Sequence, residues 1–470
     1  MVKIVGEVNE MDWLEEVKKY KEDLIEDVKG IIAIPSIKDT PKEGAPFGEG
    51  CRKALDHMLA LGEKEGFTVK NIDGYAGVIT YGEGEESVGM LAHLDVVPVG
   101  EGWSKDPFAM VEENGYLFGR GVLDDKGPAM SGFYALKMLK DNHVKLNKKI
   151  MLILGCDEES GMDCMNYYVK HAEVPTIGFT PDAEFPVIYG EKGGLHVQIS
   201  GDTETVIESM HAGERMNIVI GKASCVVKEW NDRATDMFDF YLKSNGLKGS
   251  VAYTGEKAEL MIEGAFAHAA MPYLGNNAAL HLLNFVGNCF HDKFAADTYE
   301  MLHDWQGKPV DIFMESATMG FLTMNTGIVN IENGHVEITI DIRYPLETNA
   351  DIVMAGFHKK AKAINYALDI TLEKDTKPLY VDPNSELVTT LSNVYRKYSK
   401  DETTPNMTIG GGTYAKKFPN FVAFGPEFPN RTQPEGMFVG GCHQKDEGIR
   451  VDDLLCATAI YAEALEKLAK

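Results

Sequence analysis

Short apolar runs that lead up to polar residues are the feature that most constrains the fold of this chain. Four such runs can be recognised, and they lead to His93, to Glu158 and Glu159, to Asp182 and to His443. Residues 12–33, 50–66 and 127–142 read as helices by their apolar spacing and their glycine or proline boundaries. Strands that alternate with helices indicate a mostly parallel sheet, whose ligands gather at the carboxyl ends of the strands. We therefore expect an α/β domain with these polar residues along one edge of its sheet.

The chain is too long for one ordinary core, because 470 residues normally form two or more domains. The stretch 186–385 has α+β patterning, with alternating strands such as VQISG, AELMIEGAF and HVEITIDIRYP. Helices are expected in it around 206–213, 227–245, 276–304 and 349–367. We predict that 186–385 is an insert in a catalytic domain formed by 1–185 and 386–470. Since an ordinary domain holds about 100–150 residues, the insert has room for two subdomains.

Composition excludes several classes of partner. The formal charge of −26 argues against nucleic acid or an anionic membrane as a partner. No run of 18 apolar residues is present, and the N-terminal sequence does not have the pattern of a signal peptide. Seven cysteines, odd in number and without a CxxC pair, indicate a reducing compartment. We expect a cytoplasmic protein that binds neither nucleic acid nor membrane.

The polar residues at the ends of the runs are imidazoles and carboxylates, which suit Zn²⁺ and neighbouring divalent metals. With one aspartate of the GVLDDKG segment, they make five candidate ligands: His93, Asp124, Glu159, Asp182 and His443. Two ions a few ångström apart can hold a water and polarise a carbonyl together, so the series predicts a two-metal hydrolytic site. Each residue alone has an ordinary explanation, such as a helix N-cap for the aspartate. The prediction therefore depends on their joint order.

Further acidic residues stand beside these ligands. Asp95 follows His93 by two residues on an extended segment and points to the same side, so it can accept the other ring N–H. Glu158 is adjacent to a candidate ligand and diverges from it, which suits a general base that faces the substrate. Asp124 and Asp125 both offer a carboxylate that can bridge two ions. At this point the residues leave the choice between them open.

Four sequence blocks carry a resemblance to a known family: HLDVVP, GRGVLDDKGP, LGCDEESG and FTPDAEFPVIYGEKG. Over essentially its whole length, the chain resembles the M20-family metallopeptidases, and specifically the PepV-type Xaa-His (carnosinase-like) dipeptidases. The resemblance implies a zinc-peptidase-like catalytic domain with a mixed, mostly parallel sheet and an inserted α+β lid domain. It implies the five ligands above, with Asp124 rather than Asp125 as the bridge and a cis peptide between the two. It also implies Glu158 as the base and Asp95 as the partner of His93.

Three further blocks of the family fall in the insert. ERMNIV gives Asn217, FAHAAMP gives His268 and DIRYP gives Arg343. The resemblance implies that His268 donates to the developing oxyanion, while Asn217 and Arg343 hold a substrate carboxylate. The chain departs from the commoner forms HGSxP and GAxDMKG, since it reads HAAMP and GVLDDKG.

The function expected from this resemblance is hydrolysis of the peptide bond of a dipeptide, either Xaa-His, β-alanyl or hydrophobic. Two Zn²⁺ ions per subunit are implied, with Mn²⁺ or Co²⁺ as possible substitutes. The length of the insert predicts a monomer whose lid serves its own site. The alternatives are an N-acyl amino acid deacylase or a succinyl-diaminopimelate desuccinylase and, from a different class, a catalytically silent metal-binding regulatory homologue. The presence of Glu158 argues against the silent form.

Overall fold

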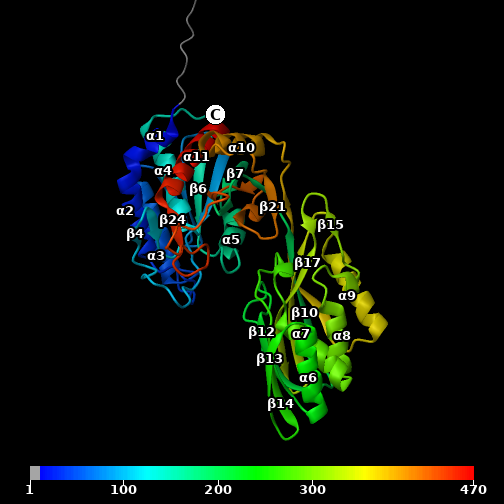
Figure 1. Ribbon diagram of the computed structural model, residues 1–470. Coiled ribbons are helices and arrows are strands. Elements are labelled where there is room, and N and C mark those ends of the chain that lie inside the picture. The colour runs from blue at the N-terminus through cyan, green and yellow to red at the C-terminus, as the bar shows by residue number, and fades with distance from the viewer. Residues whose placement is uncertain (1–10) are drawn as a thin grey trace, which may run out of the picture. The chain divides into compact units, whose positions relative to one another are not determined.

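The structure is a computed structural model that describes residues 11–470. The chain divides into two compact units, and the second is inserted in the first (Figure 1). Unit 1 runs to Tyr189 and also contains Val381–Met407 and Thr413–Lys470, while unit 2 contains Gly190–Tyr380 and Thr408–Gly412. The predicted insert of 186–385 differs from unit 2 by a few residues at each end, and Thr408–Gly412 falls outside it. The predicted first segment starts at residue 1, and its first ten residues lie outside the described part.

A nine-stranded mixed sheet has the order β1-β2-β6-β3-β7-β22-β9-β20, with β21 paired to β9. Strands β1 to β22 of this order form the centre of unit 1, whereas β9, β20 and β21 stand where the chain passes from one unit to the other. Strands β6, β3, β7 and β22 are parallel to one another, whereas β1 and β2 are antiparallel. The bounds are β1 Thr68–Ile72, β2 Ala76–Tyr81, β3 Ser87–His93, β6 Lys149–Gly155, β7 Ile177–Thr180, β9 Ile188–Glu191, β20 Leu379–Tyr380, β21 Met407–Ile409 and β22 Phe421–Ala423. The predicted α/β class with a mixed sheet is confirmed, and its four central strands are parallel to one another.

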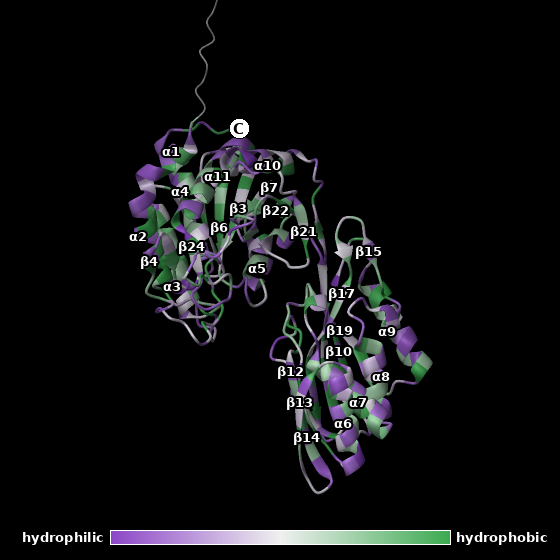
Figure 2. Ribbon diagram, viewed as in Figure 1, coloured by the Kyte–Doolittle hydropathy of each residue, from purple (hydrophilic) through white to green (hydrophobic). Residues whose placement is uncertain are grey.

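The central strands of unit 1 are buried, which explains their continuous apolar sequences. All seven residues of β3 are buried, and so are six of the seven in β6. Helices α4 (Lys126–Asp141) and α11 (Val451–Ala469) pack against both strands. Figure 2 shows these strands mainly in the hydrophobic colours, whereas the surface helices α1 and α2 carry both hydrophilic and hydrophobic colours. A parallel strand that is covered on both faces needs apolar side chains on both faces. The sequences of β3 and β6 are therefore continuously apolar rather than alternating.

The helices predicted before the first strand are present. Helix α3 (Glu49–Lys64) ends just before Gly66, whose φ of +78° lies in the left-handed region that favours glycine at a helix end. The predicted helix 12–33 is divided by a short 3₁₀ turn into α1 (Trp13–Val17) and α2 (Lys21–Ile32). Residues 127–142 match α4. Among residues 11–470, no helix has the length and hydrophobicity needed to cross a membrane.

Unit 2 is built on an eight-stranded antiparallel sheet with the order β13-β14-β12-β11-β17-β18-β10-β19. Its strands are β10 Gly193–Asp202, β11 Ile207–Ala212, β12 Lys222–Val227, β13 Lys248–Thr254, β14 Lys257–Glu263, β17 Thr323–Glu332, β18 His335–Tyr344 and β19 Asp369–Thr376. Its helices are α6 Asp232–Ser244, α7 Ala278–Phe290, α8 Lys293–Leu302 and α9 Ala350–Ile364. The sheet consists of two four-stranded halves that join between β11 and β17. One hydrophobic cluster extends across both halves, so they share a core.

The helix predicted at 206–213 is wrong, because these residues form strand β11. Ile207 and Met210 are both buried and are three residues apart, which is the spacing of a helix face. In the structure, β11 pairs with β12 and β17, and the register with β12 shifts between Ile207 and Ser209. An irregularity of this kind adds a residue to a strand, so side chains three apart can face the same side. The bulge therefore imitates helical spacing in the sequence.

Candidate metal centre

The five predicted ligands lie together in unit 1. His93 is the last residue of β3, and Glu159 and Asp182 stand in the loops after β6 and β7. Asp124 lies between β5 (Tyr116–Phe118) and α4, and His443 lies in a turn before β24 (Gly448–Arg450). The carboxyl ends of the parallel strands thus bring together residues that are far apart in the sequence, as expected for an α/β sheet.

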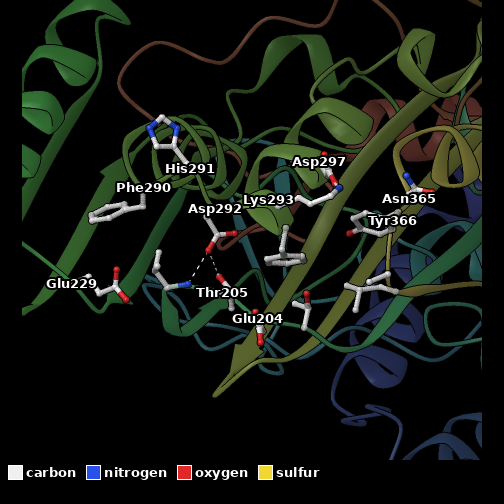
Figure 3. A pocket seen from close by; sticks show the side chains of 15 residues that line it. Glu204, Thr205, Glu229, Phe290, His291, Asp292, Lys293, Asp297, Asn365 and Tyr366 are labelled. Atoms are coloured by element: carbon white, nitrogen blue, oxygen red, sulfur yellow. Dashed lines mark hydrogen bonds and ion pairs between the residues drawn. The ribbon is translucent and has the colours of Figure 1, made fainter.

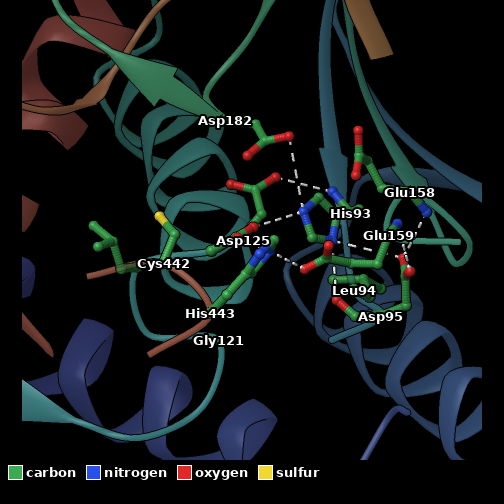
Figure 4. A network of polar contacts seen from close by, with 12 residues as sticks. His93, Leu94, Asp95, Gly121, Asp125, Glu158, Glu159, Asp182, Cys442 and His443 are labelled. Carbon is green, nitrogen blue, oxygen red and sulfur yellow. Dashed lines mark hydrogen bonds and ion pairs between the residues drawn. The ribbon is translucent and has the colours of Figure 1, made fainter. Parts of the chain in front are cut away.

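Asp124 lies between the two histidines of the cluster, His93 and His443. Both histidines are labelled in Figure 4, together with Glu159 and Asp182. Its Oδ1 is 2.9 Å from His93 Nε2, and its Oδ2 is 3.0 Å from His443 Nε2. His443 Nε2 is also 3.0 Å from Glu159 Oε1, and His93 Nε2 is 3.8 Å from Asp182 Oδ2. One carboxylate oxygen thus faces each histidine. This is the arrangement that a bridging carboxylate requires.

The donor atoms fit a cluster of divalent ions. Ligand atoms of His93, Asp124 and Glu159 lie within 4.8 Å of one another, and so do those of a second group formed by His93, Glu158 and Asp182. Imidazole nitrogens and carboxylate oxygens are the donors of many zinc sites. Nitrogen and oxygen donors of this kind also suit Mn²⁺ and Co²⁺.

The electrostatics of the cluster also favour cations. Burial alone lowers the pKa of His93, but its hydrogen bond to Asp124 and the nearby carboxylates of Asp95 and Asp182 raise it well above its ordinary value. Hydrogen bonds to Asp124 and Glu159 raise the pKa of His443 to about 10. Burial raises the pKa of Asp124, but hydrogen bonds from the two histidines lower it below its usual range. The carboxylates thus attract positive charge, and metal binding would replace the protons on the histidines.

Asp125 occupies a different position from Asp124. Its Oδ2 accepts a hydrogen bond from the backbone N–H of His93 at 2.9 Å, and the side chain is fully buried. Burial, then the charge of Asp182, raises the pKa of this carboxyl well above its usual range. The Asp124–Asp125 peptide is cis, as the resemblance implied. Of the two aspartates, it is Asp124 whose oxygens face the histidine rings.

Asp95 contacts His93 differently from the prediction. The nearest acceptor to His93 Nδ1 is the backbone oxygen of Asp95, at 2.9 Å, whereas its carboxylate Oδ1 is 3.6 Å away. The carboxylate accepts hydrogen bonds from the backbone N–H groups of Glu158 and Glu159, each at 3.1 Å. Asp95 therefore fixes both the His93 ring and the loop that carries the two glutamates.

Glu158 is half-buried beside the ligand atoms. Burial, followed by the charge of Asp182, raises the pKa of its carboxyl well above the ordinary value. A carboxylate with a raised pKa near a reacting centre is suited to proton transfer.

The segment before His443 differs from the prediction. The run FVGGC was expected to be a strand, but it forms only an isolated bridge between Gly440 and Glu447. His443 itself has a φ of +64°, in the left-handed region. The glycines before it permit a turn, and this turn, rather than a strand end, places the ring beside Asp124.

Sequence reasoning missed a buried ion pair behind the cluster. Arg120 Nη1 is 2.6 Å from Glu447 Oε2, and both side chains are almost completely inaccessible. Arg120 stands in the segment LFGRGV and Glu447 in the segment HQKDEG, each within a few residues of a candidate ligand. The only signals in the sequence were the placement of Arg120 between two glycines and the short spacing from His443 to Glu447.

The other three predicted residues lie in unit 2. The backbone N–H of Ala269 donates to the Asn217 carbonyl at 2.9 Å, and Ile218 forms a β-bridge with His268. Arg343, on β18, is opposite Thr323 on β17. The Thr323 hydroxyl in turn donates to the Ala269 carbonyl at 3.3 Å, and the Arg343 guanidinium donates to Asp341 at 2.7 Å. The structure thus links the three predicted segments within this unit.

A separate cavity of about 490 Å³ in unit 2 contains none of the predicted site residues (Figure 3). Its most buried acid, Asp292, accepts hydrogen bonds from the Thr205 hydroxyl and the Val206 N–H at 2.8 and 2.7 Å. Its other oxygen accepts from the Ala295 N–H at 2.9 Å, as the N-cap of α8. These contacts account for the Asp292 carboxylate, so the cavity is not a competing candidate for the active site.

Comparison with known proteins identifies the class. A family model described as "Peptidase family M20/M25/M40" matches residues 89–467. This match covers most of the chain, so the chain belongs to that family. It is a metallopeptidase and therefore a hydrolase, as the sequence predicted.

Individual relatives extend along the whole chain. A protein of Bacillus subtilis named "Putative dipeptidase YtjP" is 39% identical over 98% of this chain and 100% of its own length. The crystal structure of human carnosine dipeptidase 1 has a TM-score of 0.56 at 14% identity and covers 97% of this chain and 99% of its own. The yeast dipeptidase Dug1p from Saccharomyces cerevisiae has a TM-score of 0.58, also at 14% identity, over 97% of this chain and 98% of its own. At these identities, the two structures show a common fold.

Proposed function

We propose that the protein is a dinuclear zinc dipeptidase that hydrolyses the peptide bond of dipeptides. The observation that carries this proposal is the placement of Asp124 between the two histidines, with one oxygen toward each ring. A bridging carboxylate offsets part of the repulsion between two ions, which a single-metal site does not require. The family relationship supports the same conclusion, and so do whole-length relatives that carry a dipeptidase name.

Each ligand has a proposed place. His93 and Asp182 would hold one ion, Glu159 and His443 the other, and Asp124 both. Two ions in these positions would polarise the scissile carbonyl and lower the pKa of a water molecule. Asp95 keeps the His93 ring and the glutamate loop in place through the hydrogen bonds described above.

Glu158 is proposed as the general base. It takes a proton from the attacking water and delivers it to the nitrogen of the leaving amine, so that one carboxyl group serves both transfers. Its half-buried position and raised pKa support this role, because a group that must accept and then release a proton should not be too weak a base.

Residues of unit 2 are proposed to bind the substrate. Arg343 and Asn217 hold the substrate carboxylate, and His268 donates to the oxygen that becomes negative in the transition state. The buried carboxylate of Asp341 supports the role of Arg343, because it fixes one end of the guanidinium and leaves other donors for a ligand. In a dipeptide the carboxylate belongs to the residue next to the scissile bond, so a site that binds both groups would favour dipeptides over longer chains.

The remaining features of the proposal follow from the sequence. The preferred dipeptides are Xaa-His, β-alanyl or hydrophobic ones, as in the enzymes that the chain resembles. We further propose a monomer that acts in the cytoplasm. All seven cysteines are free, which suits a reducing compartment.

One set of assays tests the proposed function. Protein loaded with Zn²⁺, Mn²⁺ or Co²⁺ is offered β-alanyl-histidine, a hydrophobic dipeptide, an N-acetyl amino acid and a tripeptide, and the metal content is measured in parallel. Faster release of amino acids from the dipeptides is the expected result. Faster cleavage of the N-acetyl amino acid would make the protein a deacylase. Bound metal without hydrolysis of any substrate would make it a silent homologue.

A further inference from the structure

A single buried carboxylate links the two chain segments that supply Asp124 and His443. Glu447 has an exposed fraction of 0% and stands four residues after His443. Its Oε1 accepts hydrogen bonds from the backbone N–H groups of Gly121, Leu123 and Asp124, at 3.0, 3.0 and 3.2 Å. A carboxylate oxygen seldom receives three amides of one loop unless that loop is shaped around it. The turn that ends at Asp124 is therefore shaped around Glu447.

Backbone hydrogen bonds strengthen this link. The Gly119 N–H donates to the Glu447 carbonyl at 3.0 Å, as strand β24 pairs with β5. The Gly448 N–H donates to the Gly440 carbonyl at 3.0 Å and closes the turn that carries His443. Glu447 thus contacts the Asp124 turn through its side chain and belongs to the His443 turn through its backbone.

Arg120 supplies the opposite charge. Its Nη1 is 2.6 Å from Glu447 Oε2, and its Nη2 lies 3.5 Å from the His443 carbonyl oxygen. The guanidinium also lies over the Trp103 ring, at 5.1 Å from its centroid. Burial raises the pKa of the Glu447 carboxyl to about 7, and the Arg120 guanidinium and the hydrogen bonds from backbone N–H groups oppose this shift by stabilising the charged form. The pair can therefore position the loop without placing an unpaired charge in the interior.

We infer that Glu447 is a positioning residue for the metal centre, because it sets the distance between the bridging carboxylate of Asp124 and the ring of His443. This inference rests on the proposed function, in which both residues bind metal. Glu447 itself touches neither ligand side chain in the contacts described, and it acts through the backbone of both turns. Its predicted effect is on metal binding, before any substrate is present.

The test measures Co²⁺ binding, because the visible absorption of Co²⁺ reports the geometry of its ligands. Metal-free wild-type, Glu447→Gln, Glu447→Asp, Arg120→Lys and Glu463→Gln proteins are titrated with Co²⁺, and their unfolding midpoints are measured without metal. Glu463 is the matched control: it is also buried, with an exposed fraction of 2%, and it is paired with Lys397 and Lys467. The fall in the unfolding midpoint of Glu463→Gln therefore measures how much stability is lost when a buried, paired carboxylate far from the predicted ligands is neutralised.

We expect Glu447→Gln to bind Co²⁺ roughly 10- to 100-fold more weakly, as is typical for loss of an outer partner of a metal ligand. Its Co²⁺ spectrum should change, while its metal-free unfolding midpoint falls no further than that of Glu463→Gln. Glu447→Asp keeps the charge but is one methylene shorter, so it should lose affinity and change the spectrum to a smaller degree. Arg120→Lys keeps the opposite charge but loses the planar guanidinium that lies over Trp103 and reaches the His443 carbonyl, so it should weaken Co²⁺ binding by less than Glu447→Gln does.

The outcomes separate this inference from the proposed function. If Glu447→Gln does not fold, Glu447→Asp decides the question by the same two measurements. Wild-type affinity and spectrum in the folded Glu447 variants would overturn the positioning role, although the metal site itself would stand. A wild-type protein that binds no Co²⁺ would overturn the proposed function, and the positioning role with it.

Discussion

The predicted site residues of the two units are held in very different ways. In unit 1, His93 and Asp124 have exposed fractions of 1% and 8%, and the side chains of Glu159 and Asp182 are 9% and 18% exposed. His443, which stands in a turn, is the exception, with a side chain that is 48% exposed. In unit 2, His268 is exposed and Asn217 and Arg343 are half-buried. Ligands of a metal ion must keep a fixed geometry, and the burial of most of these residues in unit 1 contributes to it. Groups that bind a substrate must be reachable from solvent, so they stand on more open surfaces.

The sheets of the two units explain this difference. The parallel strands of unit 1 end at a common edge, so single residues after β3, β6 and β7 converge without long loops. The antiparallel sheet of unit 2 offers no such edge, and its residues are held by individual contacts. Asn325, for example, donates to the carbonyls of Met216 and Ile218 at 2.9 and 3.1 Å and so fixes the backbone on both sides of Asn217. The two units should therefore respond differently to substitution.

The largest effect is expected in the buried cluster of unit 1. Asp124→Ala should lose both metal and activity, with a loss of metal affinity beyond the roughly 100-fold seen for outer partners of ligands. Asp125→Asn is the control, since it keeps an acceptor for the His93 N–H and should retain most of the metal. Metal analysis after dialysis measures both. Equal metal loss in the two variants would show that Asp124 has no special bridging role.

A large effect on rate alone is expected for Glu158. Glu158→Ala should lower kcat by roughly 10² or more, as removal of a general base typically does, while two ions remain bound. The measurement is steady-state kinetics together with metal content. Near-normal turnover with intact metal would mean that another group transfers the proton. Loss of one ion would instead make Glu158 a ligand, in line with its grouping with His93 and Asp182.

A smaller effect is expected in unit 2. Arg343→Met should raise KM for dipeptides by roughly 10- to 100-fold, which corresponds to the loss of a charge-assisted hydrogen bond of about 1.5–3 kcal/mol. The metal content should not change. A sharper test compares kcat/KM for a dipeptide with that for its C-terminal amide, which lacks the carboxylate. The wild type should prefer the dipeptide, and Arg343→Met should lose this preference. Arg233→Met, an exposed arginine on α6, serves as the control. Unchanged discrimination in Arg343→Met would remove Arg343 from the substrate site.

The sequence predicted the features that depend on local pattern. The apolar runs before His93, Glu158 and Asp182 located strands β3, β6 and β7, because buried parallel strands need apolar residues on both faces. The strand expected before His443 was wrong, since two glycines there permit a turn. The helix expected at 206–213 was wrong because a bulge in β11 imitates helical spacing.

Contacts between distant segments could not be predicted in the same way. Glu447 and Arg120 are 327 residues apart in the sequence, and most hydrogen bonds of Glu447 go to backbone N–H groups. A backbone donor has no residue type, so no sequence pattern reveals it. The nearest acceptor of His93 Nδ1 was missed for a related reason, because it is the backbone oxygen of Asp95 rather than its carboxylate.

The last prediction concerns how the two units cooperate, and its expected effect is zero. Glu158→Ala inactivates a residue of unit 1 and His268→Ala a residue of unit 2, and each variant should be inactive alone. If the protein is a monomer whose inserted unit serves its own chain, a mixture of the two variants contains no complete site and should remain inactive. Sedimentation velocity on the same samples should give a single species of about 52 kDa, the mass of one chain. Activity in the mixture, up to about a quarter of the wild type for randomly paired dimers with two shared sites, would show that unit 2 completes the site of a partner.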